Sequence, residues 1–167
     1  MLPGAHLSDD RVAYFAYGSC MNHASLAASL DYDVTSFFVG PAQLIDFALR
    51  FNYPSINAPT CCCANIEAEA GAVVEGALYD LPRELMDSVD RREGVSANRY
   101  SRTVVPVQFE RAVKMAFCYR GSVTLPYEAA PSERYRELLT RGLLDSRVSE
   151  EYRLSVISKM ASLPART

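Results

Sequence analysis

The chain has 167 residues, of which 49% are hydrophobic and 22% are charged, and this composition is typical of one globular domain rather than of a disordered or fibrous chain. Its 17 basic and 20 acidic residues leave a net charge of −3, which argues against a protein that binds mainly nucleic acid. No apolar run approaches the roughly 20 residues that cross a bilayer, and the first residues lack the basic and apolar regions of a signal peptide. We therefore expect a cytoplasmic protein with no membrane and no nucleic acid as partner.

Histidine and cysteine usage narrows the chemistry. The two histidines are His6 and His23, so neither a histidine-rich metal site nor a Ser-His-Asp triad is expected, and we predict no metal. The five cysteines are odd in number and lack CxxC spacing; they are Cys20, Cys61, Cys62, Cys63 and Cys118. We interpret them as free thiols that serve as small hydrophobic residues in a reducing compartment, with a redox or a metal role as the alternatives.

Apolar periodicity predicts both strands and helices. In chain order, we expect a strand over residues 12–17, a helix over 22–30, strands over 44–52, 61–68 and 72–79, a helix opened by Pro82, strands over 103–109 and 113–119, and helices over 132–143 and 149–160. Residues 44–52 alternate apolar and polar side chains, as a half-buried strand does. Gly71 predicts a hairpin between the strands that flank it, and Glu110-Arg111 predicts a second one.

Because strands outnumber helices and neighbouring strands look hairpin-linked, we expect an α+β fold with a mainly antiparallel or mixed sheet. One domain is expected over residues 12–160, between an N-terminal tail over 1–11 and a frayed C-terminal tail over 161–167.

Glu93 is the candidate general base. It follows Val89 by four residues and Met86 by seven, so a helix that persists to Glu93 places this carboxylate on the buried stripe and in the negative last turn. Both effects raise the pKa of a carboxyl group, and Gly94 is suited to end such a helix. The alternative is an unwound last turn with Glu93 in water, whereas Asp90 is expected to be a solvated surface acid.

The turn after the first strand is the second candidate segment. Gly18 permits a tight or left-handed backbone, and free N–H groups at such a turn can hold an anion or oxyanion. Ser19 can cap the following helix instead. Cys20 at a helix N-terminus is a possible nucleophile assisted by His23, but no third orienting residue is evident, so we favour a buried and inert thiol.

Three segments in this order resemble the gamma-glutamylcyclotransferase family. They are Tyr17-Gly18-Ser19, then Val89 to Val95 with its Glu93-Gly94 pair, and Tyr127-Glu128-Ala129-Ala130-Pro131 before a helix. Tyr100 matches a tyrosine that the family places seven residues after its glutamate. The similarity runs from about Val12 to Met160.

The resemblance implies a β-barrel-like mixed sheet with flanking helices, and cyclisation of a γ-glutamyl group to 5-oxoproline with release of an amine or amino acid. It implies that Glu93 is the catalytic base, and that Tyr17, Gly18, Ser19, Cys20, Tyr100 and Tyr127 bind a small γ-glutamyl substrate without a cofactor. Cys20 replaces the family's usual asparagine, so any side-chain amide contact is lost. A non-catalytic module that binds small carboxylates and a Cys20-dependent hydrolase are the alternatives.

Overall fold

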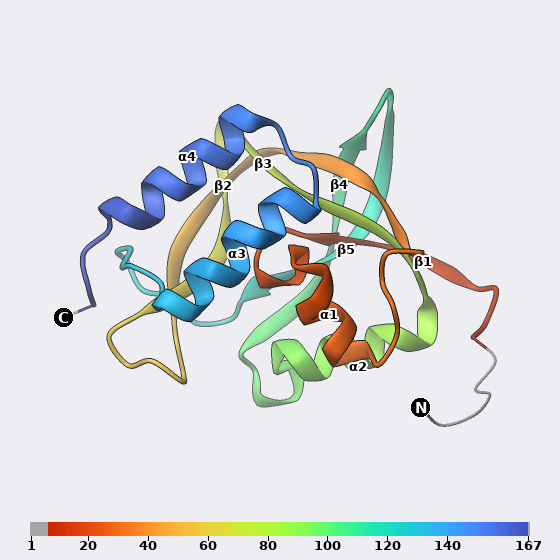
Figure 1. The fold of residues 1–167 in the computed structure, drawn as a ribbon, viewed down its shortest axis with the longest axis horizontal. Helices are drawn as coiled ribbons and strands as arrows, with labels where there is room; N and C mark the ends of the chain where they lie inside the picture. The colour runs from red at the N-terminus through yellow and green to blue at the C-terminus, as the bar shows by residue number, and fades with distance from the viewer. Residues whose placement is uncertain (1–6, 167) are drawn as a thin grey trace.

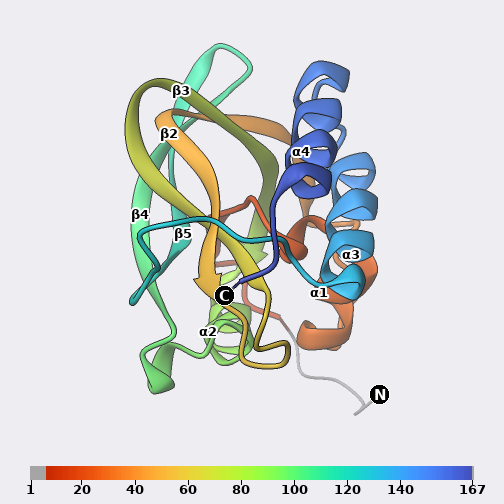
Figure 2. The same ribbon diagram turned by 90° about the vertical axis from the view of Figure 1, so that its left-hand side faces the viewer.

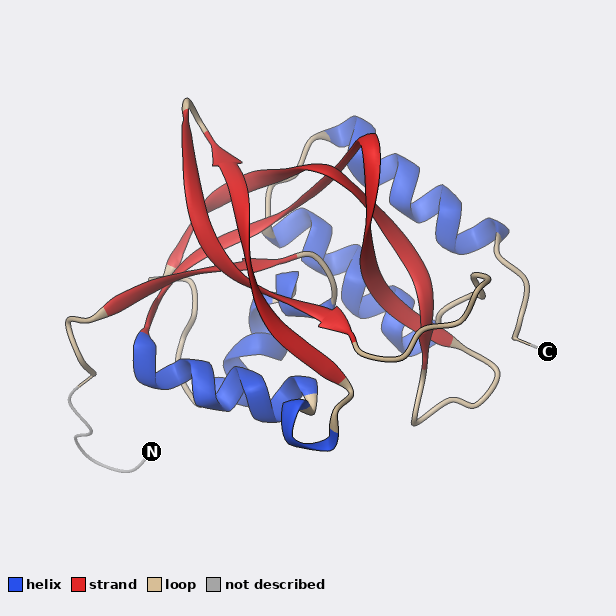
Figure 3. Ribbon diagram, turned by 180° about the vertical axis from the view of Figure 1, so that it is seen from behind, coloured by secondary structure: helices blue, strands red, loops and turns tan. Residues whose placement is uncertain are grey.

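Five strands close into a barrel in the computed structural model, which describes residues 7–166 (Figures 1 and 3). They are β1 (Arg11–Ala16), β2 (Phe38–Pro54), β3 (Cys62–Pro82), β4 (Tyr100–Phe109) and β5 (Ala112–Gly121). Their order around the barrel is β1-β3-β2-β4-β5. The barrel closes where β1 runs parallel to β5 at Tyr14 and Phe117, and the other neighbours are antiparallel. The expected single domain of α+β class with a mixed, barrel-like sheet is confirmed.

Four α-helices flank the barrel: α1 (His23–Leu30), α2 (Met86–Glu93), α3 (Glu133–Asp145) and α4 (Glu150–Ser162). Short 3-10 turns are η1 (Ser19–Met21), η2 (Arg83–Leu85) and η3 (Val95–Ala97). Figure 2 shows α3 and α4 side by side along one side of the barrel, with α1 and α2 below them. Helices α1, α3 and α4 begin within about two residues of the predicted positions, because the side chains of Asn22, Ser132 and Ser149 each accept a backbone N–H at the start of a helix. The helix predicted to open at Pro82 begins later, at Met86, after the 3-10 turn η2.

The predicted hairpin at Gly71 is wrong. Residues 62–68 and 72–79 belong to the single strand β3, and both halves pair with β2 rather than with each other. The paired ribbon bends where Asp46 (φ 63°) lies opposite Gly71 (φ 83°), and the Gly71 N–H donates to Asp46 Oδ1 over 2.9 Å. A glycine flanked by apolar runs is typical of a hairpin, but here it marks a bulge that curves a long strand pair around the barrel.

The same bulge breaks the alternation predicted for residues 44–52. The register slips between Ile45 and Phe47, so the inward-facing positions change phase along β2. Leu44 is buried before the bulge while Ile45 is 43% exposed, and Leu49 and Phe51 are buried after it. Ile45 therefore lies outside the core, although the sequence placed it on the buried face.

The hairpin predicted across Glu110-Arg111 is confirmed, with β4 and β5 paired from Tyr100 and Gly121 to Phe109 and Ala112. The C-terminal segment is not frayed as far as the structure describes it. Pro164 O accepts a hydrogen bond from Ala130 N, and the Arg166 N–H donates to Thr60 O, both over 2.7 Å. Residues 1–6, including His6, and Thr167 lie outside the described residues.

Candidate active site

A cavity of about 320 Å³ opens at the end of the barrel where β1, α2 and α3 meet. Its wall comes from nearly every element of the fold: Tyr14, Phe15, Ala16, Tyr17, Gly18, Ser19, Cys20, Tyr53, Ser55, Ile56, Asn57, Cys63, Ala64, Arg92, Glu93, Arg99, Tyr100, Tyr119 and Tyr135. Six of the seven residues that the sequence singled out are therefore neighbours here, and Tyr127 is the exception.

Glu93 is the last residue of α2, and its side chain lines this cavity. Met86 and Val89 are buried on the same face of the helix, which turns the Glu93 side chain inward as its spacing predicted. Gly94 ends the helix with φ 66°, and its N–H bonds to the carbonyls of Asp90 and Arg91. The predicted alternative, an unwound last turn with Glu93 in water, is wrong.

The carboxyl group of Glu93 lies in a poor place for a negative charge. Burial raises its pKa above the ordinary glutamate value, while the neighbouring Arg92 guanidinium and a hydrogen bond from Cys20 oppose the rise. Cys20 Sγ donates to Glu93 Oε1 over 3.2 Å. The side chain of Glu93 is half-buried and lines the cavity, so a ligand there would meet this carboxylate directly.

The turn from Tyr17 to Cys20 forms the opposite wall. The backbone of Gly18 has φ −114° rather than a left-handed conformation, and glycine fits here because a Cβ would come within 3.0 Å of Tyr135 Oη. The first hydrogen bond inside the turn runs from Met21 N to Gly18 O. The amides of Ser19 and Cys20 therefore have no acceptor within the turn.

Arg92 ties this turn to α1 and α2. Its Nη2 donates to Ser19 Oγ over 3.0 Å and to Ser25 Oγ over 2.9 Å, and its Nη1 donates to Ser25 O and Ser29 Oγ over 2.8 Å. Ser19 is therefore an acceptor for Arg92, and the cap of α1 is Asn22 instead. The arginine holds the turn and places a fixed positive charge beside Glu93.

Tyrosines form the third side of the cavity. Tyr100 Oη donates to Ala64 O over 2.8 Å, and Ala64 N donates to Tyr135 Oη over 3.2 Å, so both rings are anchored to one residue of β3. The ring of Tyr53 lies 4.4 Å from that of Tyr100. Tyr135 and Tyr53 were missed by sequence reasoning. The signal for Tyr135 was its place one turn inside the helix that follows the Tyr127 to Pro131 segment.

Tyr127 is 44% exposed and lies outside this cavity, on a surface hollow lined by Arg50, Asn52 and Glu67. Its neighbour Glu128 connects that segment to β2 and α4. Glu128 Oε1 accepts the backbone N–H of Phe51 over 2.9 Å and lies 2.8 Å from Lys159 Nζ. The segment therefore fixes the connection before α3 and so positions Tyr135, while the predicted place of Tyr127 at the site is not observed.

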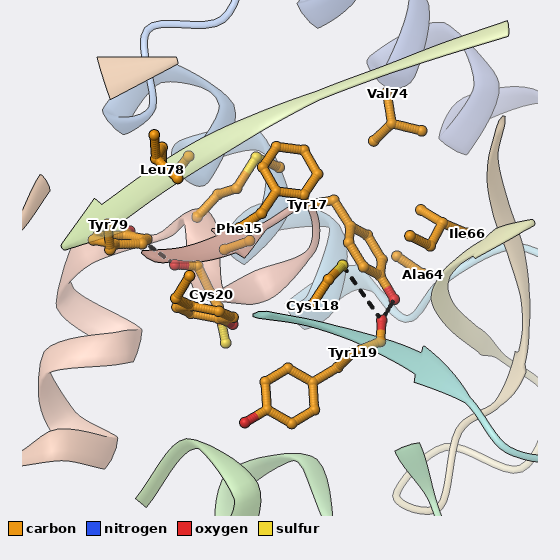
Figure 4. Close-up of a cluster of buried hydrophobic side chains, with 14 of the residues drawn as sticks. Phe15, Tyr17, Cys20, Ala64, Ile66, Val74, Leu78, Tyr79, Cys118 and Tyr119 are labelled. Atoms are coloured by element: carbon orange, nitrogen blue, oxygen red, sulfur yellow. Dashed lines mark hydrogen bonds between the residues drawn. The ribbon is translucent and has the colours of Figure 1, made fainter. Parts of the chain in front are cut away.

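The geometry around Cys20 argues against a nucleophilic thiol. Burial raises the pKa of Cys20 to about 12, although Arg92 opposes the rise. The ring of His23 packs against Phe38 at 4.8 Å and Tyr79 at 5.9 Å, and His23 is absent from the cavity wall. Figure 4 shows Cys20 among buried aromatic rings. The thiol is protonated at neutral pH, as the interpretation of an inert cysteine requires.

Asp90 is not the solvated acid that the sequence predicted. Its side chain is half-buried: Tyr119 Oη donates to Asp90 Oδ1, and Arg102 Nη1 lies 3.6 Å from Asp90 Oδ2. Asp90 thus supports a tyrosine of the cavity wall.

All five cysteines are free thiols. Within residues 7–166, the His, Cys, Asp and Glu side chains form no group of three or more with metal-ligand geometry, and none of the helices is long and apolar enough to span a membrane.

Comparisons with known proteins find similar sequences and similar structures. Residues 73–155 match the AIG2-like family. A putative gamma-glutamylcyclotransferase of Bacillus subtilis, YkqA, is 29% identical over 163 residues, which are 94% of this chain and 55% of YkqA. The chain thus spans little more than half the length of this curated relative.

Solved structures share the fold. The YkqA crystal structure superposes with a TM-score of 0.83 at 27% identity and covers 93% of this chain and 56% of its own. A gamma-glutamyl cyclotransferase has a TM-score of 0.77 at 22% identity, over 93% of this chain and 89% of its own. A yeast gamma-glutamyl cyclotransferase specific to glutathione has a TM-score of 0.59 at 14% identity, over 93% of this chain and 98% of its own. The chain therefore has the fold of these structures and is similar over 94% of its length to a putative gamma-glutamylcyclotransferase.

Proposed function

We propose that this protein is a γ-glutamyl cyclotransferase, which converts a γ-glutamyl group to 5-oxoproline and releases the amine that it acylated. The observation that carries the proposal is the position of Glu93: a carboxylate with a raised pKa lines a cavity of about 320 Å³, opposite a turn with unpaired backbone amides. An acid held in an environment that disfavours its charge is a good proton acceptor near neutral pH.

The chemistry uses these parts in sequence. The α-amino group of the substrate is mostly protonated below its pKa of about 8, so it must lose a proton before it can attack. Glu93 accepts that proton. The amine then attacks the γ-carbonyl carbon of the same molecule and forms the ring C–N bond. Glu93 passes its proton to the leaving nitrogen as the original γ-amide C–N bond breaks. Glu93 then accepts the second proton of the ring nitrogen and passes it to the released amine, which leaves as an ammonium ion, so Glu93 ends ionised as it began.

The walls of the cavity support the other requirements of this reaction. The amides of Ser19 and Cys20 are donors without a partner in their turn, and such donors stabilise the oxyanion that forms on the γ-carbonyl. The rings of Tyr53, Tyr100 and Tyr135 enclose the space in which the substrate must fold back on itself. Because the attack is intramolecular, holding that folded conformer supplies much of the rate. The similarity to YkqA, a putative gamma-glutamylcyclotransferase, and to the fold of a gamma-glutamyl cyclotransferase supports this assignment.

The experiment is incubation of the purified protein with a panel of γ-glutamyl dipeptides and γ-glutamylamines, with 5-oxoproline measured by mass spectrometry. We expect turnover of at least one compound and a loss of about two to four decades in rate for Glu93→Gln, the usual contribution of a general base. Asp87→Asn is the matched control, because Asp87 is an exposed acid on the first turn of the same helix.

An active Glu93→Gln protein would place the base elsewhere. Ligand binding without turnover by the unaltered protein would instead support the non-catalytic binding module. A Cys20-dependent hydrolase predicts hydrolysis of the γ-glutamyl bond to free glutamate, which the same mass measurement distinguishes from 5-oxoproline.

A further inference from the structure

The thiol of Cys20 is placed to donate a hydrogen bond to Glu93. The residue is 3% exposed, and its Sγ lies 3.2 Å from Glu93 Oε1. Two buried neighbours, the phenol of Tyr14 and the guanidinium of Arg92, favour the thiolate, yet burial still keeps the pKa of Cys20 near 12. A protonated thiol beside a carboxylate donates a hydrogen bond to it through its S–H group.

The turn that carries this thiol is held on both sides. Tyr79 Oη donates to the carbonyl oxygen of Cys20 over 2.9 Å, as the dashed line in Figure 4 marks. On the other side, Arg92 holds the adjacent Ser19 through its hydroxyl. The sulfur therefore approaches Glu93 from a turn that contacts of β3 and α2 hold in place.

The hydrogen bond leaves the two carboxylate oxygens of Glu93 unlike each other. Oε1 accepts from Cys20, whereas within the described residues no protein donor contacts Oε2. Since Glu93 lines the cavity and Oε1 is engaged by Cys20, we take Oε2 as the oxygen that accepts from a substrate amine. A carboxylate anchored at one oxygen presents the other in a defined direction.

The ionisation of Glu93 depends on the titratable and charged groups that surround it. They come from every element around it: Tyr14, Tyr17, Cys20, Tyr53, Cys63, Arg92, Arg99, Tyr100, Cys118, Tyr119 and Tyr135. The phenols and thiols among them have raised pKa values, so they stay neutral at neutral pH. Arg99 is exposed at the rim, and Asp90 turns away to Tyr119 and Arg102. Arg92 and Cys20 are the two groups that favour the ionised form of Glu93.

We propose that Cys20 is a positioning residue for the base: its thiol anchors Glu93 Oε1 by a hydrogen bond and so aims Oε2 at the substrate. The inference deepens the proposed function and rests on it for the role of Glu93. It gives the cysteine that stands in the family's asparagine position a role in catalysis without a covalent step.

The test is a carbon-13 NMR titration of the Glu93 side-chain carboxyl in the unaltered protein, Cys20→Ala and Cys20→Ser. Loss of a donor to a charged acceptor raises the pKa of that acceptor, so we expect the Glu93 midpoint to rise by about one pH unit in Cys20→Ala. Serine retains an O–H donor, so Cys20→Ser should restore the midpoint. Cys118→Ala is the matched control, because Cys118 is equally buried but its nearest acceptor is the carbonyl of Tyr119.

The pH profile of kcat/KM gives the second readout. Its acid limb reports the base in the free enzyme, so in Cys20→Ala the limb should move to higher pH, with about a tenfold loss below it and recovery above it. An unmoved Glu93 midpoint in Cys20→Ala, or an equal rise in Cys20→Ser, would overturn the inference whatever the turnover. A moved midpoint in a protein that cyclises no γ-glutamyl compound would support the hydrogen bond and overturn the proposed function instead.

Discussion

Gly18 and Tyr135 are in close contact across the cavity wall: a methyl group added to Gly18 would lie 3.0 Å from Tyr135 Oη. Tyr135 cannot move freely away, since its hydroxyl accepts the backbone N–H of Ala64 over 3.2 Å. The bare backbone of Gly18 thus brings a β1 turn and an α3 side chain together. Any larger residue at position 18 must push the tyrosine aside or fill the cavity.

The contact predicts the effect of enlarging Gly18. In a Glu93→Gln background, which prevents turnover, Gly18→Val should abolish substrate binding measured by calorimetry, and the melting temperature should confirm that the variant is folded. Gly18→Ala should bind weakly, and adding Tyr135→Phe should recover part of the affinity because it removes the crowded hydroxyl. Unchanged affinity in Gly18→Val would show that the turn does not contact the ligand.

Local sequence patterns predict individual helices and strands, but they do not predict contacts between segments that lie far apart in the chain. Glu93 and Gly94 were predictable because one short helix carries both its apolar stripe and its stop signal. Tyr135 has no such signal, since it reaches the site only through the packing of α3 against the turn at Gly18. Tyr127 was misplaced for the same reason. The bulge at Asp46 and Gly71 joins residues 25 positions apart, and a local pattern could not distinguish it from a hairpin turn.

Alkylation should separate Cys20 from the partly exposed cysteines. With a pKa of about 12, Cys20 carries almost no thiolate at pH 7.5, so iodoacetamide should leave it unmodified in the folded protein. Cys61, which is partly exposed, should react first, and Cys20 should react only after denaturation. Peptide mass spectrometry locates the label. Rapid labelling of Cys20 with parallel loss of activity would instead indicate a reactive nucleophile.

The two tyrosines that the sequence paired should behave differently. Tyr100→Phe removes the bond to Ala64 O inside the cavity wall, so the ring next to the substrate loses its anchor and KM should rise several-fold. Tyr127→Phe removes a hydroxyl on the outer surface and should leave KM and kcat unchanged. Steady-state kinetics on one γ-glutamyl substrate compares both. An effect of Tyr127→Phe as large as that of Tyr100→Phe would return Tyr127 to the site.

The stability of Glu93→Gln should depend on pH in a defined direction. Burial raises the pKa of Glu93 in the folded protein above its unfolded value, which is about 4.3. Between these two values the folded state binds more protons than the unfolded state, so the glutamate destabilises the protein progressively as pH rises. Glutamine does not titrate and removes a negative charge from the C-terminal end of α2. The variant should therefore melt at a higher temperature than the unaltered protein at pH 8, and this gain should vanish below the unfolded pKa.

Glu133→Gln is the control for that measurement, since Glu133 is an exposed acid in the first turn of α3, where its charge favours the helix. Its melting temperature should not exceed that of the unaltered protein at any pH. Calorimetric melts of the three proteins from pH 3.5 to pH 8 make the comparison. A gain for Glu93→Gln that is constant across this range would mean that the two side chains differ only in packing. A loss at pH 8 would mean that Arg92 and the Cys20 thiol stabilise the carboxylate by more than burial costs, and Glu93 would then be too weak a base for the proposed reaction.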